Sequence, residues 1–322
     1  MRTLLITDLH FADKPRGLLA AQKKSVLNLL VSEEYDDIIM MGDLMMNRKP
    51  SPSVLLALKD VVDYCADSKK PLTIIRGNHD SETKADDGTT ALSMFDYHAK
   101  VVTQTWYDHK TKRAFLPHYE DDERIKLDLA AVPKKYCVFG HFGYRGALNS
   151  AGDADFDLKL SDFLNTSFLG HVHRYVKRKN VTILGTPYTT NFGEWDKASY
   201  YAILDKDTVE LKTLSEGPRH ILLDYKDLHD NLDFINESSW FTMLRVLVDK
   251  DSGPIPYEKL NVPFLDIKWK PSFDEDELST YTPDRRLFTL NEIIIEDYVD
   301  SSNTSLSKED IMGGYNLIKN ED

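Results

Sequence analysis

The chain has 322 residues, of which 41% are hydrophobic and 11% aromatic, enough for one full-sized domain with a smaller appendage. No apolar run reaches the ~20 residues of a membrane span and the N-terminus lacks a signal-peptide pattern, so we expect a cytoplasmic protein without a membrane segment. The two cysteines, Cys65 and Cys137, lack CxxC spacing and are expected to be reduced core residues.

The net charge of −13 is concentrated near the C-terminus. Residues 274–322 hold 13 acidic and 4 basic residues, a net of −9, which leaves −4 for residues 1–273. The short basic clusters could contact phosphates or be ordinary solvated surface; they are Lys23-Lys24, Arg48-Lys49, Lys134-Lys135 and Lys177-Arg178-Lys179. Because bound divalent cations add positive charge, an acidic protein can still act on a phosphodiester.

Short apolar runs alternate with helical patterns up to about residue 205, which predicts an α/β domain with helix-covered strands. The expected strands are 3–7, 37–41, 72–75, 136–139, 166–169, 181–184 and 200–204. Helices are expected over 18–34 and from an N-cap at Ser53 to before Pro71. Residues 84–128 are expected to mix helix, loop and edge strand.

After about residue 215 the pattern changes to a few strands, of which 241–248 and 264–269 are the clearest. We therefore predict a main domain over 1–212, a smaller α+β capping domain over 213–284 and a short helical tail over 285–322. A domain as small as the second would be marginally stable alone, so it is expected to pack against the first domain or a partner.

Metal-binding side chains stand where the predicted strands end, in the segments DLH, GD, GNHD, GH and GHVH. They are Asp8, His10, Asp43, Asn78, His79, His141, His171 and His173. Sites form at that edge of an open α/β sheet, and strand alternation would turn Asp8 with His10, and His171 with His173, to the same side. A lone histidine is more often surface or core, but five such segments in order predict a dinuclear site. Carboxylate, imidazole and amide ligands favour Mn²⁺, Fe²⁺ or Zn²⁺ over Ca²⁺.

This series of motifs resembles the calcineurin-like metallophosphoesterase superfamily, and the resemblance implies a four-layer α/β/β/α sandwich with two divalent cations, expected to be Mn²⁺. It implies one cation held by Asp8, His10, Asp43 and His173, and a second held by Asp43, Asn78, His141 and His171. Asp43 would bridge the two. His79 would stay unligated and protonate the leaving oxygen or stabilise its charge. Asp80 either orients His79 or is a simple turn residue.

Other segments favour a DNA nuclease within that superfamily. GDLMMNRKPSPS and GNHD differ from the GDxVDRG and GNHE of protein phosphatases, and Pro50 matches a proline in SbcD-type nucleases. Residues 181–194, VTILGTPYTTNFGE, resemble the SbcD pattern of an apolar strand, Gly-Ser/Thr-Pro and Phe-Gly-Glu, and residues 200–205 resemble its closing strand. The order of the parts resembles the compact phage branch, the recombination endonuclease subunits of T-even-type phages, for which the location would be the host cytoplasm.

One residue departs from that pattern. Some relatives carry a histidine or an aspartate near the DNA, three residues after the bridging aspartate, where this chain has Met46. The methionine is either core packing or an apolar wall.

The resemblance implies an endo/exonuclease subunit for DNA end processing, recombination and repair, with DNA as substrate, an SbcC-like ABC-type coiled-coil ATPase as partner, and a homodimer. Two apolar stripes in the tail could bind the ATPase or pack on the capping domain: Leu287, Leu290, Ile294 and Val299, and then Ile311, Tyr315 and Ile318. The rival readings are a small-molecule or cyclic-nucleotide phosphodiesterase with the same ligands, and a non-enzymatic DNA-binding subunit. The second rival would be expected to have lost ligands, and none is missing.

Overall fold

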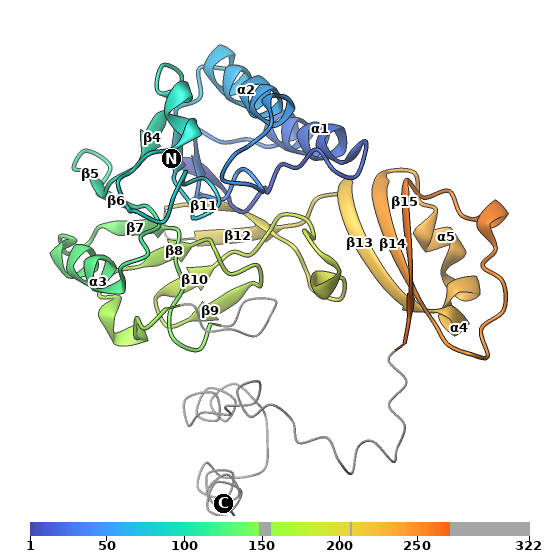
Figure 1. Ribbon diagram of the computed structural model, residues 1–322. Helices are drawn as coiled ribbons and strands as arrows, with labels where there is room; N and C mark the ends of the chain where they lie inside the picture. The colour runs from blue at the N-terminus through green and yellow to red at the C-terminus, as the bar shows by residue number, and fades with distance from the viewer. Residues whose placement is uncertain (148–155, 207, 271–322) are drawn as a thin grey trace, which may run out of the picture. The chain divides into compact units, whose positions relative to one another are not determined.

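Two six-stranded mixed sheets form the centre of the computed structural model, which describes residues 1–147, 156–206 and 208–270 (Figure 1). The first sheet has the order β12 (Thr208–Lys212), β11 (Tyr201–Asp205), β1 (Arg2–Ile6), β2 (Asp37–Met40), β3 (Leu72–Ile75) and β4 (Lys100–Val102). The second has the order β5 (Trp106–Asp108), β6 (Arg113–Leu116), β7 (Cys137–Gly140), β8 (Ser167–Leu169), β10 (Val181–Ile183) and β9 (Val176–Arg178). Strands β1 to β4 run parallel, as do β6, β7, β8 and β10. Parallel strands end at one edge, so the loops that follow them gather there.

Strand alternation decides which side chains lie between the sheets. Leu4 belongs to the core beneath the helices, whereas its neighbour Leu5 belongs to the core shared by the two sheets. From the second sheet, Phe115, Phe139 and Phe168 enter the shared core as a row of stacked rings with centroids 5.5 and 5.7 Å apart. This dry layer fixes the two sheets face to face.

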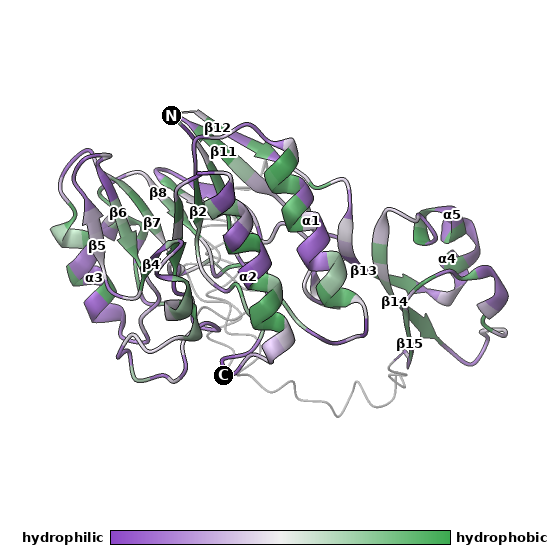
Figure 2. Ribbon diagram, turned by 90° about the horizontal axis from the view of Figure 1, so that it is seen from above, coloured by the Kyte–Doolittle hydropathy of each residue, from purple (hydrophilic) through white to green (hydrophobic). Residues whose placement is uncertain are grey.

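Helices cover the other face of each sheet. Helices α1 (Leu18–Ser32) and α2 (Pro52–Asp67) pack on the first sheet, and α3 (Asp122–Ala131) packs on the second. Figure 2 shows hydrophobic and hydrophilic residues on different sides of α1 and α2. No described helix combines the length and apolar composition that a membrane crossing requires.

The expected α/β architecture is confirmed, and two sheets with outer helices agree with the expected sandwich. The predicted cap of α2 was wrong: Ser51 accepts a hydrogen bond from the amide of Val54, at 3.4 Å, and Pro52 takes the first helical position. The poorly patterned 84–128 stretch contains η1 (Ala91–Phe95), β4, β5, β6 and the start of α3. Strands β9 and β12 escaped prediction because they are partly exposed edge strands without a buried alternating face.

A third sheet follows, with three parallel strands β13 (Gly217–Asp224), β14 (Trp240–Val248) and β15 (Phe264–Trp269). Helices α4 (Tyr225–Leu228) and α5 (Leu232–Ile235) connect β13 to β14 and share a small core with the sheet. The short 3-10 turns are η2 (Leu160–Asp162), η3 (Phe192–Glu194), η4 (His229–Asn231) and η5 (Tyr257–Lys259). The sheet supports in part the expected α+β capping domain. Its limits of 213–284 stay a prediction, and the expected helical tail over 285–322 lies outside the described residues.

The ends of three strands converge at Gly42, which follows β2 and has a φ of +93°. A Cβ atom at this position would collide with Nδ1 of His141, which follows β7, and would lie 3.0 Å from the Cα atom of Gly77, which follows β3. Glycine therefore allows the two sheets to bring their loops together at this edge.

Replacing Gly42 by alanine is expected to destabilise the protein more than the same change at Gly88. Both glycines have a positive φ, +93° and +83°, so both variants incur about 1–2 kcal/mol of backbone strain. At Gly88 the nearest atoms to a new Cβ are 3.5 Å away, so only Gly42→Ala adds overpacking, about 1–3 kcal/mol more. Urea unfolding of the metal-free variants measures both, and equal losses would contradict the crowding argument.

Candidate metal centre

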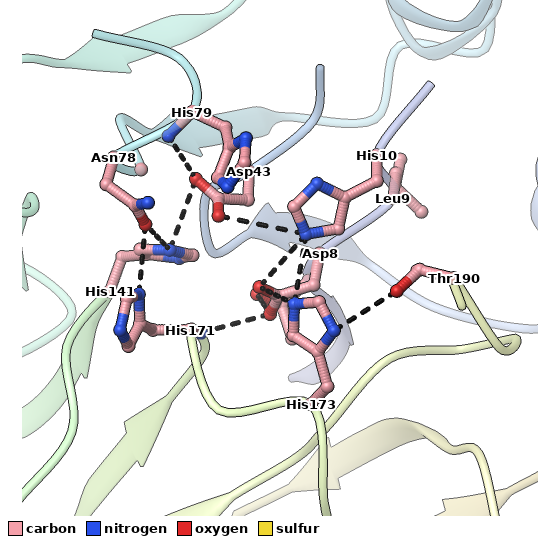
Figure 3. A network of polar contacts seen from close by, with 12 residues as sticks. Asp8, Leu9, His10, Asp43, Asn78, His79, His141, His171, His173 and Thr190 are labelled. Carbon is pink, nitrogen blue, oxygen red and sulfur yellow. Dashed lines mark hydrogen bonds and ion pairs between the residues drawn. The ribbon is translucent and has the colours of Figure 1, made fainter. Parts of the chain in front are cut away.

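All eight sequence-predicted residues meet at this edge, in the loops that follow the parallel strands (Figure 3). Asp8 and His10 follow β1, Asp43 follows β2, Asn78 and His79 follow β3, His141 follows β7, and His171 and His173 follow β8. Five residues therefore come from the first sheet and three from the second. Their roles as ligands stay predictions, and their convergence is a property of the fold.

Backbone conformation at this edge differs from the strand alternation that was expected. β1 ends at Ile6, and both Asp8 and His10 adopt left-handed backbone angles, with φ of 55° and 45°. Asp43 and His171 are also left-handed, with φ of 51° and 80°. Each such residue costs on the order of 1–3 kcal/mol, a strain typical of functional sites. Tight loop turns, rather than alternation along a strand, aim these side chains.

Asp8, His10 and His173 form one cluster of buried or partly buried ligand atoms. His10 Nε2 and His173 Nε2 are 3.0 Å apart, and they lie 3.8 and 3.6 Å from Asp8 Oδ1. Asp8 Oδ2 accepts hydrogen bonds from the Thr7 hydroxyl and the His171 amide, whereas the buried Oδ1 has no hydrogen-bond partner among the described residues. Two nitrogen ligands at right angles on a cation, with bonds of about 2.1 Å, would be about 3.0 Å apart. The cluster therefore fits a divalent cation.

Asp43, His141 and His171 form a second cluster, and Asn78 lies among them. Asn78 Oδ1 is 3.2 Å from His141 Nε2 and 2.9 Å from His171 Nδ1. Nδ1 of His141 lies 2.6 Å from the carbonyl oxygen of Met41, where it donates a hydrogen bond and leaves Nε2 facing Asp43. These donors also suit a transition-metal cation.

The Asp43 carboxylate lies between the clusters, as Figure 3 shows. Its Oδ2 is 3.8 Å from His10 Nε2, and its Oδ1 is 3.3 Å from His141 Nε2. Burial would raise the pKa of Asp43, but the nearby His141 holds it well below its usual range. Burial also lowers the pKa of His141, yet Asp43 outweighs it and raises that pKa to about 9. An ionised carboxylate with one oxygen toward each cluster fits the predicted bridging position.

His79 has its ring beside His10, with centroids 4.9 Å apart and planes at 89°. Its backbone amide donates to Asp43 Oδ1 at 2.8 Å, and its Nδ1 lies 2.6 Å from the carbonyl oxygen of Met46. The Met46 carbonyl therefore orients the ring and leaves Nε2 available. The assignment of His79 as the unligated acid stays a prediction.

The carboxylate of Asp80 accepts its hydrogen bonds from backbone amides, and its predicted role in orienting His79 stays a prediction. Its fully buried carboxylate accepts from the amides of Leu44 and Met45 at 3.0 and 3.2 Å, and from the amide of Gly77 at 2.9 Å. Burial, followed by the charge of Asp43, raises the pKa of Asp80 to about 7. Asp80 therefore ties together the loops that carry Asp43 and His79, and its described bonds go to backbone amides rather than to the His79 ring.

Two further side chains belong to the site and were not singled out. Glu194 accepts a hydrogen bond from His173 Nδ1 at 2.7 Å. His118 follows β6 and stacks on His171, with centroids 5.6 Å apart. Burial, followed by the neighbouring histidines, lowers the pKa of His118 to about 3 and keeps the ring neutral. Glu194 lies in the Phe-Gly-Glu motif of the sequence. His118 could have been found from its position after a strand.

Asp43→Ala is expected to lose both cations, because each cluster loses one carboxylate oxygen. Metal analysis of the purified variant would measure the loss. The matched control is Asp63→Ala on α2, which removes a carboxylate paired with Lys59 and should retain wild-type metal content. One cation retained at wild-type affinity in Asp43→Ala would refute the shared position.

A family model described as calcineurin-like phosphoesterase matches residues 1–201 of the chain. That range contains all eight sequence-predicted residues and Glu194. No curated protein matches the chain.

Proposed function

The chain belongs to the calcineurin-like phosphoesterase family, and from this premise we propose that it is a metal-dependent endo/exonuclease that hydrolyses DNA phosphodiester bonds. The two Asp and His clusters, with the Asp43 carboxylate between them, carry the coarser conclusion, that the protein is a metal-dependent phosphoesterase. DNA as substrate, and a role in end processing, recombination and repair, are the finer proposal.

Different side chains have different roles in the proposed hydrolysis of a phosphodiester. Two divalent cations, when bound, supply positive charge for the attacking and leaving oxygens and activate water. His79, held at Nδ1 by Met46, presents Nε2 to the centre between the clusters, where it delivers a proton to the leaving oxygen. Asp80 keeps the His79 loop at a fixed distance from Asp43 through the Gly77 amide. Mn²⁺ is the cation we propose, and it is one of the three, with Fe²⁺ and Zn²⁺, that a mixture of imidazole nitrogen with carboxylate and amide oxygen favours.

The third sheet packs against residues that follow β1 and β2 near the metal centre, and this neighbouring element supports a polymeric substrate. Met243 of β14 packs against Ala12 and Leu18, and the half-buried Met46 joins the same cluster. Met46 therefore packs toward the third sheet rather than into the main core. The GTPYTTNFGE segment, which has the SbcD pattern, connects the centre to this sheet.

A cavity that contains basic side chains lies beside the second cluster. Its volume is about 260 Å³, and its charged lining consists of Arg48 and Lys84 with the acidic Glu120 and Asp122. Both basic side chains pair with Glu120, at 3.2 and 3.6 Å. By contrast, Lys134 and Lys177 line a groove at the opposite ends of the strands. We therefore propose that Arg48 and Lys84, rather than the other basic clusters, contact the DNA backbone near the scissile bond.

The cavity also motivates the alternative function, a small-molecule or cyclic-nucleotide phosphodiesterase, because about 260 Å³ could accept a mononucleotide. The two functions differ in their substrates. A protein that hydrolyses cyclic nucleotides or bis-p-nitrophenyl phosphate but leaves DNA intact would support the alternative.

The purified chain is expected to cleave linear, hairpin or single-stranded DNA in the presence of Mn²⁺. His79→Ala should lose about 10²–10⁴-fold in rate while binding both cations, because only the proton donor is removed. His98→Ala, which removes an exposed histidine that belongs to neither cluster, is the control and should keep full activity. Absence of DNA cleavage with either Mn²⁺ or Mg²⁺, with and without an ATPase partner, would overturn DNA as substrate.

We also propose an SbcC-like coiled-coil ATPase as partner and a homodimer as the working form. The apolar stripes over residues 285–318 support an ATPase-binding role for the tail. Deletion of residues 285–322 is then expected to abolish co-purification with the ATPase, measured by pull-down, and to leave Mn²⁺ binding unchanged. Retained co-purification would show that the ATPase binds elsewhere.

A further inference from the structure

Glu194 is a buried carboxylate directly behind one of the predicted ligands. Its residue is 2% exposed, and Oε1 lies 2.7 Å from Nδ1 of His173. Oε2 accepts from the Thr190 amide at 2.7 Å, and the side chains of Thr190 and Asn191 donate to the same carboxylate at 3.1 and 2.6 Å. A buried carboxylate with this many donors is held in one orientation.

This contact determines which nitrogen of His173 faces the metal centre. Because Nδ1 donates to Glu194, the lone pair of Nε2 points toward His10 Nε2, at 3.0 Å, and Asp8 Oδ1, at 3.6 Å. A carboxylate that holds the far nitrogen of a ligating histidine fixes its tautomer and ring orientation, and makes the ligand nitrogen more basic. Glu194 itself belongs to neither cluster.

The two clusters are supported differently. In the second cluster, the far nitrogen of His141 is held by the neutral backbone carbonyl of Met41, at 2.6 Å. In the first, the far nitrogen of His173 is held by the charged side chain of Glu194. A substitution at Glu194 therefore acts on one cluster, whereas Asp43 serves both.

The same short segment is anchored to the third sheet. The hydroxyl oxygen of Thr189 accepts from the backbone amide of His220 on β13 at 2.7 Å. The Phe192 ring packs edge-on against His220, with centroids 4.8 Å apart. The guanidinium of Arg245, on β14, lies over the Phe192 ring, 4.0 Å from its centroid. Residues 189–194 thus contact the third sheet at one end and hold His173 at the other.

We propose that Glu194 is a positioning residue that fixes His173 for the cation held by Asp8, His10 and His173, and that the 189–194 segment couples the affinity for this cation to the third sheet. The inference rests on the metal-dependent phosphoesterase site and is independent of whether DNA is the substrate. A contact that reorders residues 189–194 through the third sheet would change one cation's affinity and leave the other's unaltered.

The experiment is Mn²⁺ titration of the full, metal-free chain by calorimetry, with electron paramagnetic resonance to separate a spin-coupled pair from a single ion. Wild type is expected to bind two ions. Glu194→Gln keeps the size of the side chain and removes its charge, and Glu194→Ala removes the contact. Both should weaken one ion by about 10–100-fold and leave the other near wild-type affinity. At intermediate Mn²⁺ the pair signal should give way to that of an isolated ion.

Two controls separate positioning from a general effect on folding. Glu210→Gln makes the same change at an exposed residue of β12 and should bind both ions as wild type does. Thermal unfolding of each metal-free variant, followed by circular dichroism, should show that the Glu194 variants remain folded. Thr189→Val, which loses the acceptor for the His220 amide, should weaken the same ion by a smaller factor.

Unchanged affinity for both ions in the Glu194 variants would overturn the positioning role. Equal weakening of both ions would overturn it as well, since that pattern indicates a general structural role. Wild-type behaviour of Thr189→Val would overturn the coupling to the third sheet. Because the readout is Mn²⁺ binding, failure of DNA cleavage would leave these outcomes unaffected.

Discussion

The buried Asp43 carboxylate stands where the two sheets meet, with Oδ2 3.8 Å from His10 Nε2 and Oδ1 3.3 Å from His141 Nε2. A negative charge taken out of water is costly unless other groups compensate it, and here imidazoles from both sheets surround it. The crowding explains the small residues nearby. A Cβ atom at Gly77 would overlap Asp43 Oδ1, and one at Gly42 would overlap His141. The centre therefore requires both sheets to be packed face to face before it exists.

The strain at this edge is balanced by contacts away from it. Four of the predicted ligands have left-handed backbone angles, and all four lie outside the regular strands. The Asp80 carboxylate instead accepts hydrogen bonds from three backbone amides of these loops. The stacked Phe115, Phe139 and Phe168 hold the sheets beneath the loops. A rigid core thus supports loops whose local conformation would be unfavourable in an isolated peptide.

The metal centre bears on which reaction the protein catalyses, and its surroundings bear on which substrate it accepts. The carboxylates and histidines determine that a phosphoester is cut, and they are common to the family to which residues 1–201 belong. We propose that the substrate is decided by what lies beyond them, namely the 189–194 segment, the third sheet and the cavity beside Arg48. Glu194 belongs to both parts, since it holds His173 and lies in the segment that contacts the third sheet.

Much of the fold and the site could be predicted from the sequence, and particular residues show which features could not be. Apolar runs predicted β1, β2 and β3 to within a residue or two, because buried strands have local signatures, and ligand-type residues at strand ends predicted the eight residues that meet at the edge. The partly exposed β9 and β12 had no such signature. The sequence by itself determined the chemistry of the centre, since ligand type and order along the chain are local properties. Only the tertiary structure decided that Met46 orients His79, that Asp80 serves backbone amides and that Glu194 holds His173. Each of these contacts joins residues from different loops, and their separation depends on how two sheets pack.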